Sequence, residues 1–86
     1  MPQISRFFGI IISMYYDDHN PPHFHARYGE HKASINIEDM AIMEGSLPPR
    51  VLGLVAEWAI SHKQELRADW NRARESQPLL PVEPLK

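Results

Sequence analysis

The chain has 86 residues, no cysteine and a formal net charge of −2. A chain of this length holds one hydrophobic core, so we expect a single domain over residues 1–86. The lack of cysteine excludes disulfides and thiolate ligands or nucleophiles, and it is typical of a cytoplasmic protein. The slight acidity argues against a strongly basic nucleic-acid binder. No apolar run reaches the ~18 residues that a membrane helix needs, so we expect no membrane association.

The first half of the chain predicts a small antiparallel sheet. Residues 10–16 are β-branched and aromatic, which is typical of a strand. Residues 23–28 and 32–37 alternate between apolar and polar side chains and are joined by a short turn, so they predict a hairpin with one face in water. Residues 40–44 are expected to form a short fourth strand. The expected core-facing residues are Ile10, Ile12, Met14, Tyr16, Phe24, Ala26, Tyr28, Ala33, Ile35 and Ile37.

The second half predicts one long amphipathic helix over residues 46–76. Ser46 is the expected N-cap, followed by Pro48 and Pro49 in the first turn. Apolar residues then recur at steps of three and four, and a kink is expected, if anywhere, near His62, where this stripe thins. The stripe comprises Val51, Val55, Trp58, Ala59, His62, Leu66, Trp70 and Ala73, with both tryptophans expected in the core.

Residues 77–86 are expected to be extended and to dock on the protein's own domain or on a partner. The predicted fold is therefore α+β. A small antiparallel sheet of three or four strands packs against one long C-terminal helix.

The stretch from Asp17 to Arg27 contains three of the five histidines. His23 and His25 are two residues apart on one predicted strand face, a spacing that can chelate a divalent metal such as zinc. His19 or Asp17 could supply a third ligand, so His19, His23 and His25 are the candidate metal ligands. The alternative is that the histidines hydrogen-bond the loop backbone and hold the turn in shape.

Other readings of the same face remain open. A metal-free ribonuclease would use His23 or His25 as general base and acid, with Arg27 or Lys32 stabilising a phosphate. The two cations could also bind nucleic acid together with tyrosines, which the net acidity disfavours. The predicted water-facing side also carries Ser34. The full set of candidate binding residues is Tyr15, Asp17, Asp18, His19, Asn20, His23, His25, Arg27 and Lys32.

Five short sequence segments, spread over the chain, together form a recognisable pattern. They are ISRFFGI at residues 4–10, MYYDDHNPPHFHA at 14–26, Leu47-Pro48, Glu57-Trp58-Ala59 and VEPL at 82–85. This pattern resembles the small bacterial family known as domain of unknown function 4160, over nearly the whole chain. The most specific part runs from Asp18 to His25. Val82 stands where an isoleucine is more usual.

The resemblance implies no established activity and no catalytic residue. It implies a gene context similar to that of toxin–antitoxin modules, beside another small protein. The expected function is therefore that of a cytoplasmic binding component of a toxin–antitoxin-type or regulatory pair. It would act on a protein partner by recognition rather than chemistry, and a homo-oligomer stays open. The competing hypothesis is a metal-dependent hydrolase or ribonuclease toxin built on His19, His23 and His25.

Overall fold

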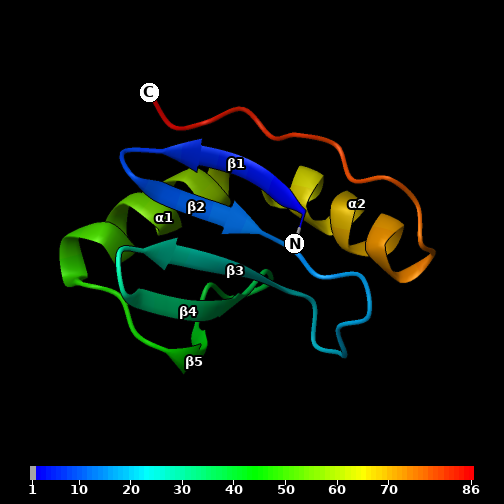
Figure 1. The fold of residues 1–86 in the computed structure, drawn as a ribbon, viewed down its shortest axis with the longest axis horizontal. Helices are drawn as coiled ribbons and strands as arrows, with labels where there is room; N and C mark the ends of the chain where they lie inside the picture. The colour runs from blue at the N-terminus through cyan, green and yellow to red at the C-terminus, as the bar shows by residue number, and fades with distance from the viewer. Residues whose placement is uncertain (1) are drawn as a thin grey trace.

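The sheet is an antiparallel meander of five strands in the computed structural model, which describes residues 2–86 (Figure 1). The strands are β1 (Gln3–Phe7), β2 (Ile10–Ser13), β3 (His23–Tyr28), β4 (His31–Asn36) and β5 (Ile42–Gly45). Their order in the sheet follows the chain, so each strand pairs with the next one. The strands at the two edges are therefore β1 and β5.

The prediction of three or four strands was wrong because it missed β1. The register of β1 against β2 shifts between Gln3 and Ser5, so Ile4 and Ser5 are both buried and the alternation is broken. The turn to β2 consists of Phe8 and Gly9, with φ angles of 50° and 77°. Positive φ at both central residues defines the type I′ turn that joins hairpins, but Phe8 is an uncommon residue there.

Two helices cover one face of the sheet, α1 (Pro49–Ser61) and α2 (Lys63–Arg74) (Figure 1). The prediction of a single helix is wrong, because the helix is interrupted at His62 (φ −121°, ψ 24°) and two helices result. The break lies at the predicted place. The helical start is also later than predicted, because Ser46 donates its backbone N–H to the Lys32 carbonyl and does not cap α1.

The core lies between the sheet and the predicted helix stripe. Trp58 is fully buried between Phe7 and Phe24, with ring centroids 5.2 and 6.0 Å away, and Trp70 is buried too. The prediction that both tryptophans belong to the core is confirmed. The stripe residues that are buried are Val51, Val55, Trp58, Ala59, Leu66, Trp70 and Ala73.

The C-terminal segment docks on the protein's own domain along the edge of β1 (Figure 1). Val82 is buried and donates its backbone N–H to the carbonyl of Ile4 over 2.7 Å. The indole N–H of Trp58 donates to the Glu83 carbonyl over 2.7 Å. Asp69, buried on α2, accepts the backbone N–H of Leu80 over 2.9 Å. The Val82 bond lies on the β1 edge and the other two hold the segment against the helices, so the segment covers β1 and β5 is the open edge.

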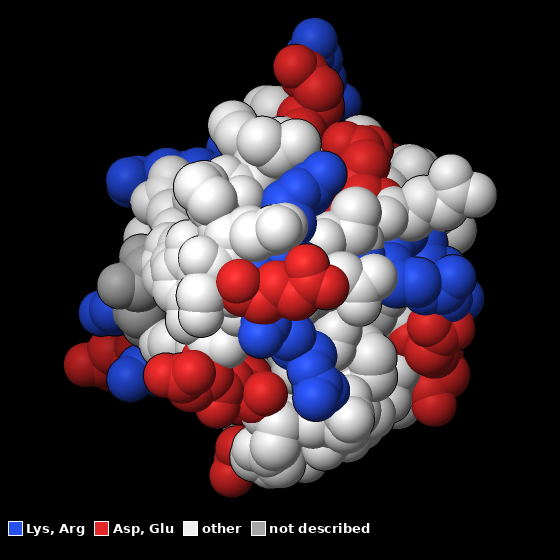
Figure 2. Space-filling model, turned by 90° about the vertical axis from the view of Figure 1, so that its right-hand side faces the viewer, with Lys and Arg blue, Asp and Glu red and all other residues white. Residues whose placement is uncertain are grey.

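Charges of both signs are mixed over the end of the molecule where α2 lies. Figure 2 shows Lys and Arg side chains next to Asp and Glu on this face. Arg67 and Lys63 of α2 pair with Glu38, which follows β4, and the hydrogen bond from Arg67 lowers the pKa of the Glu38 carboxyl. Within residues 2–86, no helix has the length and apolar character to cross a membrane.

Candidate metal centre

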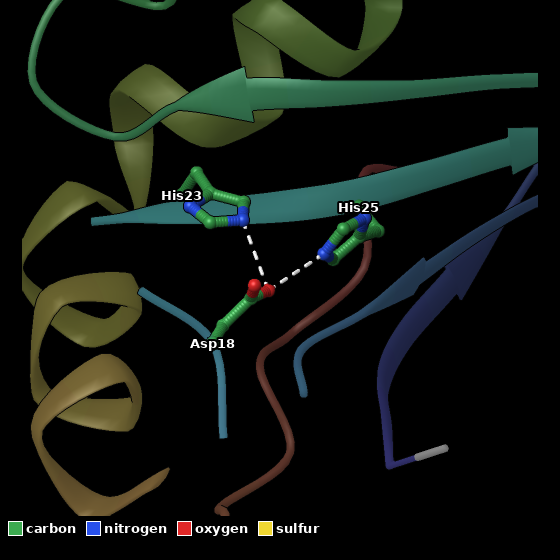
Figure 3. Close-up of side chains that lie close together, drawn as sticks. All are labelled: Asp18, His23 and His25. Carbon is green, nitrogen blue, oxygen red and sulfur yellow. Dashed lines mark hydrogen bonds and ion pairs between the residues drawn. The ribbon is translucent and has the colours of Figure 1, made fainter. Parts of the chain in front are cut away.

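The candidate site lies where the loop after β2 meets the start of β3. His23 and His25 are the first and third residues of β3, so their side chains leave the strand on the same side. Figure 3 shows both rings directed at Asp18, which comes from the loop. Oδ2 of Asp18 lies 2.9 Å from Nε2 of His23 and 3.0 Å from Nε2 of His25. One carboxylate oxygen thus faces two imidazole nitrogens.

The His23 ring is buried, with only 5% of its side chain exposed. It packs against the indole of Trp70, with 5.2 Å between ring centroids. The prediction that this ring stands on the water-facing side is wrong, because α2 brings Trp70 against it. The other ring nitrogen, Nδ1, lies 2.7 Å from the carbonyl oxygen of Pro21. His23 therefore contacts its own loop at one nitrogen and Asp18 at the other.

The His25 ring is half-buried, with 25% of its side chain exposed. Its Nδ1 lies 3.3 Å from the hydroxyl oxygen of Ser34, its register partner in β4. The ring of Tyr15 stands edge-on to the His25 ring, with 4.3 Å between the ring centroids. The prediction that Ser34 faces water is wrong, because Ser34 is buried, as is Ser13 on the other side of His25. The surface at His25 is thus a shallow recess and not an open sheet face.

Asp18 carries a negative charge at neutral pH. Burial by itself raises the pKa of its carboxyl, but the hydrogen bond from His25 and the charges of the His23 and His25 rings act in the opposite direction. With the backbone N–H of His19, they hold the pKa below its ordinary value of 3.8. The side chain is 17% exposed, so the anion is only partly hydrated.

A neutral His23 ring cannot donate a hydrogen bond to both of the acceptors that face it. A carbonyl oxygen only accepts, so Nδ1 must carry the hydrogen that faces Pro21. Nε2 then presents a lone pair to the Asp18 carboxylate, which also only accepts. Either a second proton on the ring or a metal ion between the two groups satisfies both atoms.

The ligand atoms of Asp18, His23 and His25 all lie within 4.8 Å of one another. Ligand atoms around a tetrahedral zinc ion lie about 3.3 Å apart, so the two separations between the Asp18 oxygen and the histidine nitrogens need to widen by only a few tenths of an ångström. Metal-binding histidines usually direct their outer ring nitrogen to a carboxylate, a backbone carbonyl or water. The Pro21 carbonyl is such a partner for His23, and the Ser34 hydroxyl oxygen takes the same place beside His25. Two histidines and one carboxylate are an established ligand set for divalent transition metals.

Sequence reasoning placed His23 and His25 among the candidate ligands but gave the third position to His19 or Asp17. The structure brings Asp18 to that position instead. The His19 side chain is 90% exposed, and its Nδ1 lies 3.8 Å from the other Asp18 oxygen. Asp17 and Asn20 are exposed in the same loop. Nothing in the spacing of the loop residues distinguishes Asp18 from its neighbours, because loop acids have no periodicity.

A pocket of about 290 Å³ opens beside His25 on the sheet face away from the helices. It brings together four of the nine candidate binding residues, Tyr15, His25, Arg27 and Lys32, while Asp17, Asp18, His19, Asn20 and His23 do not line it. The polar and charged residues that line it are Ser13, Tyr15, His25, Arg27, Lys32, Ser34 and Glu44. The Asp18–His23–His25 group therefore adjoins a recess of small-molecule size.

Comparison with known proteins gives one family. No curated protein and no solved structure matches the chain. A family model described as "Domain of unknown function (DUF4160)" matches residues 9–71, a range that runs from the β1–β2 turn into α2 and includes the whole candidate site. The chain therefore belongs to the DUF4160 family.

Proposed function

We propose that Asp18, His23 and His25 bind a divalent metal ion, with zinc as the first candidate, and that the protein is a metal-dependent hydrolase. The observation that carries this proposal is the pair of acceptors around His23. Its Nδ1 faces the Pro21 carbonyl and its Nε2 faces the Asp18 carboxylate. A metal ion satisfies this geometry, and Nε2 of His25, which otherwise donates to the same carboxylate oxygen, is within reach as a further ligand.

Hydrolysis is the reaction class that this ligand set supports when it holds zinc. Zinc held by three side chains keeps a position open for water and acts as a Lewis acid. Trp70 closes the site on the His23 side, whereas Asp18 and His25 are partly exposed. Access from solvent is therefore on the side of His25, where the pocket lies.

The test begins with metal binding by protein purified without a histidine tag. We expect one zinc ion per chain by elemental analysis and titration calorimetry. Asp18→Asn and His23→Gln should each weaken zinc binding at least tenfold. The matched control is His31→Gln, an exposed histidine at the start of β4, which should bind zinc like the parent protein. Zinc binding that is absent, or unchanged in the two site variants, would contradict the proposal.

The hydrolase part is tested separately on zinc-loaded protein. Ester and phosphate-ester substrates that release nitrophenol report hydrolysis directly. Turnover should disappear on chelation, return with zinc and stay low in His23→Gln. If the protein binds zinc at these residues but shows no chelator-sensitive turnover of esters or of phosphate esters, it is a metal-binding protein and not a hydrolase.

A second candidate function is that of a binding component of a toxin–antitoxin-type pair that acts on a small protein encoded beside it. The specific support is the edge strand β5, all of whose residues are exposed. Ile42 and Met43 expose 38% and 40% of their surface there. An uncovered edge can pair with a strand of another chain.

This second function is tested by co-expression with the product of the neighbouring gene. Met43→Lys should abolish co-purification, whereas His23→Gln should retain it, because no residue of β5 belongs to the Asp18–His23–His25 group. Light scattering on the protein alone shows whether a second copy occupies the edge instead. A complex that survives Met43→Lys would argue against β5 as the interface.

A further inference from the structure

Two positively charged residues stand opposite each other on neighbouring strands at the pocket beside His25. Arg27 and Lys32 are register partners in β3 and β4, and both line the pocket. Like charges directly opposite each other on neighbouring strands destabilise a sheet. Within residues 2–86, neither side chain has a carboxylate within 4.0 Å. An anion bound between them would remove this repulsion.

The position of this pair relative to the metal centre defines the length of a ligand. His25 and Arg27 lie on the same face of β3 and are two residues apart, which places their Cα atoms roughly 6.7 Å apart. His25 belongs both to the candidate ligand group and to the pocket lining. The pocket therefore has a metal end at His25 and a cationic end at Arg27 and Lys32.

We propose that the pocket binds a small phosphate ester, with the phosphate between Arg27 and Lys32 and the rest of the molecule directed towards His25. The metal end of this assignment rests on the proposed function, but the cationic end does not. A phosphate monoester carries about −1.5 to −2 charges near neutral pH, which matches two cations better than a single carboxylate. The Nε of Arg27 donates to the Gly29 carbonyl over 3.4 Å, and the terminal N–H groups of its guanidinium are donors suited to phosphate oxygens.

Glu44 also lines the pocket but belongs to the neighbouring row of residues. It is the register partner of Ser34, which in turn pairs with His25. Its carboxylate is placed to accept a hydrogen bond from a hydroxyl group of the ligand and would repel a second phosphate near His25. The row containing Glu44 therefore favours a ligand with one anionic end.

Phenyl phosphate is the probe for this proposal, with phenyl acetate as its neutral counterpart and benzoate as its carboxylate counterpart. Binding is measured by calorimetry on metal-free protein, because zinc-loaded protein would hydrolyse the ester probes under the proposed function. The test variant is the double substitution Arg27→Gln, Lys32→Gln. The matched control is Arg50→Gln, Arg74→Gln, which changes the net charge equally at exposed residues outside the pocket.

We expect phenyl phosphate to bind at least tenfold more tightly than phenyl acetate or benzoate. The test variant should lose about tenfold in affinity for it while keeping the zinc affinity of the parent protein, and the control should lose neither. Equal loss in test and control variants, or no loss in the test variant, would overturn the proposal. If the protein binds no zinc, the proposed function fails, and the metal-free titrations still decide whether Arg27 and Lys32 bind phosphate.

Discussion

The His23 ring lies against the indole of Trp70, with 5.2 Å between their centroids. A metal ion held at Nε2 of His23 would therefore lie close to Trp70, whereas Trp58 lies in the core between Phe7 and Phe24. We expect a paramagnetic ion such as Co²⁺ to quench the fluorescence of Trp70. A Trp58→Phe variant, in which Trp70 is the remaining tryptophan, should show the full effect.

The control for this prediction is Trp70→Phe, which keeps Trp58 as the reporter. Its fluorescence should respond only weakly to Co²⁺. Trp58 has its own histidine neighbour, His62, at 5.7 Å between centroids. Strong quenching in Trp70→Phe would place the ion near His62 and not at the proposed site.

Ser34 is expected to position His25 as a ligand. Its hydroxyl lies 3.3 Å from Nδ1 of that ring. Because the outer hydrogen bond fixes the orientation of a metal-bound histidine, Ser34→Ala should lower zinc affinity about tenfold while the protein stays folded. Ser13→Ala is the matched control, since Ser13 is the register partner of His25 on the other side, and we expect unchanged zinc affinity. Calorimetry of both variants checks the difference.

The lowered pKa of Asp18 predicts acid sensitivity of the metal-free protein. The carboxyl has a lower pKa when folded than its ordinary value of 3.8, so its contribution to stability is complete above that value. This contribution is lost as the pH falls through the lower folded pKa. The free energy of unfolding, measured with urea, should therefore fall more steeply below about pH 4 for the parent protein than for Asp18→Asn. Parallel pH profiles of the two proteins would contradict the prediction.

The sequence predicted the parts of the fold that depend on periodicity. The helix stripe, the hairpin of β3 and β4, and the break at His62 follow from repeats of two or of three to four residues. β1 was missed because its register shift puts Ile4 and Ser5 both in the interior. A bulge breaks the alternation on which the recognition of a strand depends.

Only the part of the candidate site that lies on β3 could be predicted from the sequence. The spacing of His23 and His25 indicates a common side of β3, and their rings do converge there on one carboxylate oxygen. The choice of Asp18 and the burial of His23 depend on the path of a loop and on the approach of Trp70. Both are tertiary features without a local sequence signal, so pattern analysis alone could not find them.

Gly45 is expected to be essential for the strand that closes the pocket. It has a φ of +79°, and a Cβ there would lie 2.1 Å from the carbonyl oxygen of Lys32 in β4. Because neither the backbone conformation nor the contact tolerates a side chain, Gly45→Ala should reduce the free energy of unfolding by about 2–3 kcal/mol. Gly53, in α1, has open space around its Cβ position, and Gly53→Ala should instead stabilise by up to about 1 kcal/mol. Urea unfolding of both variants measures this difference in sign. Equal effects of the two substitutions would mean that β5 does not pack on Lys32 as described, and the pocket would then lack its β5 wall.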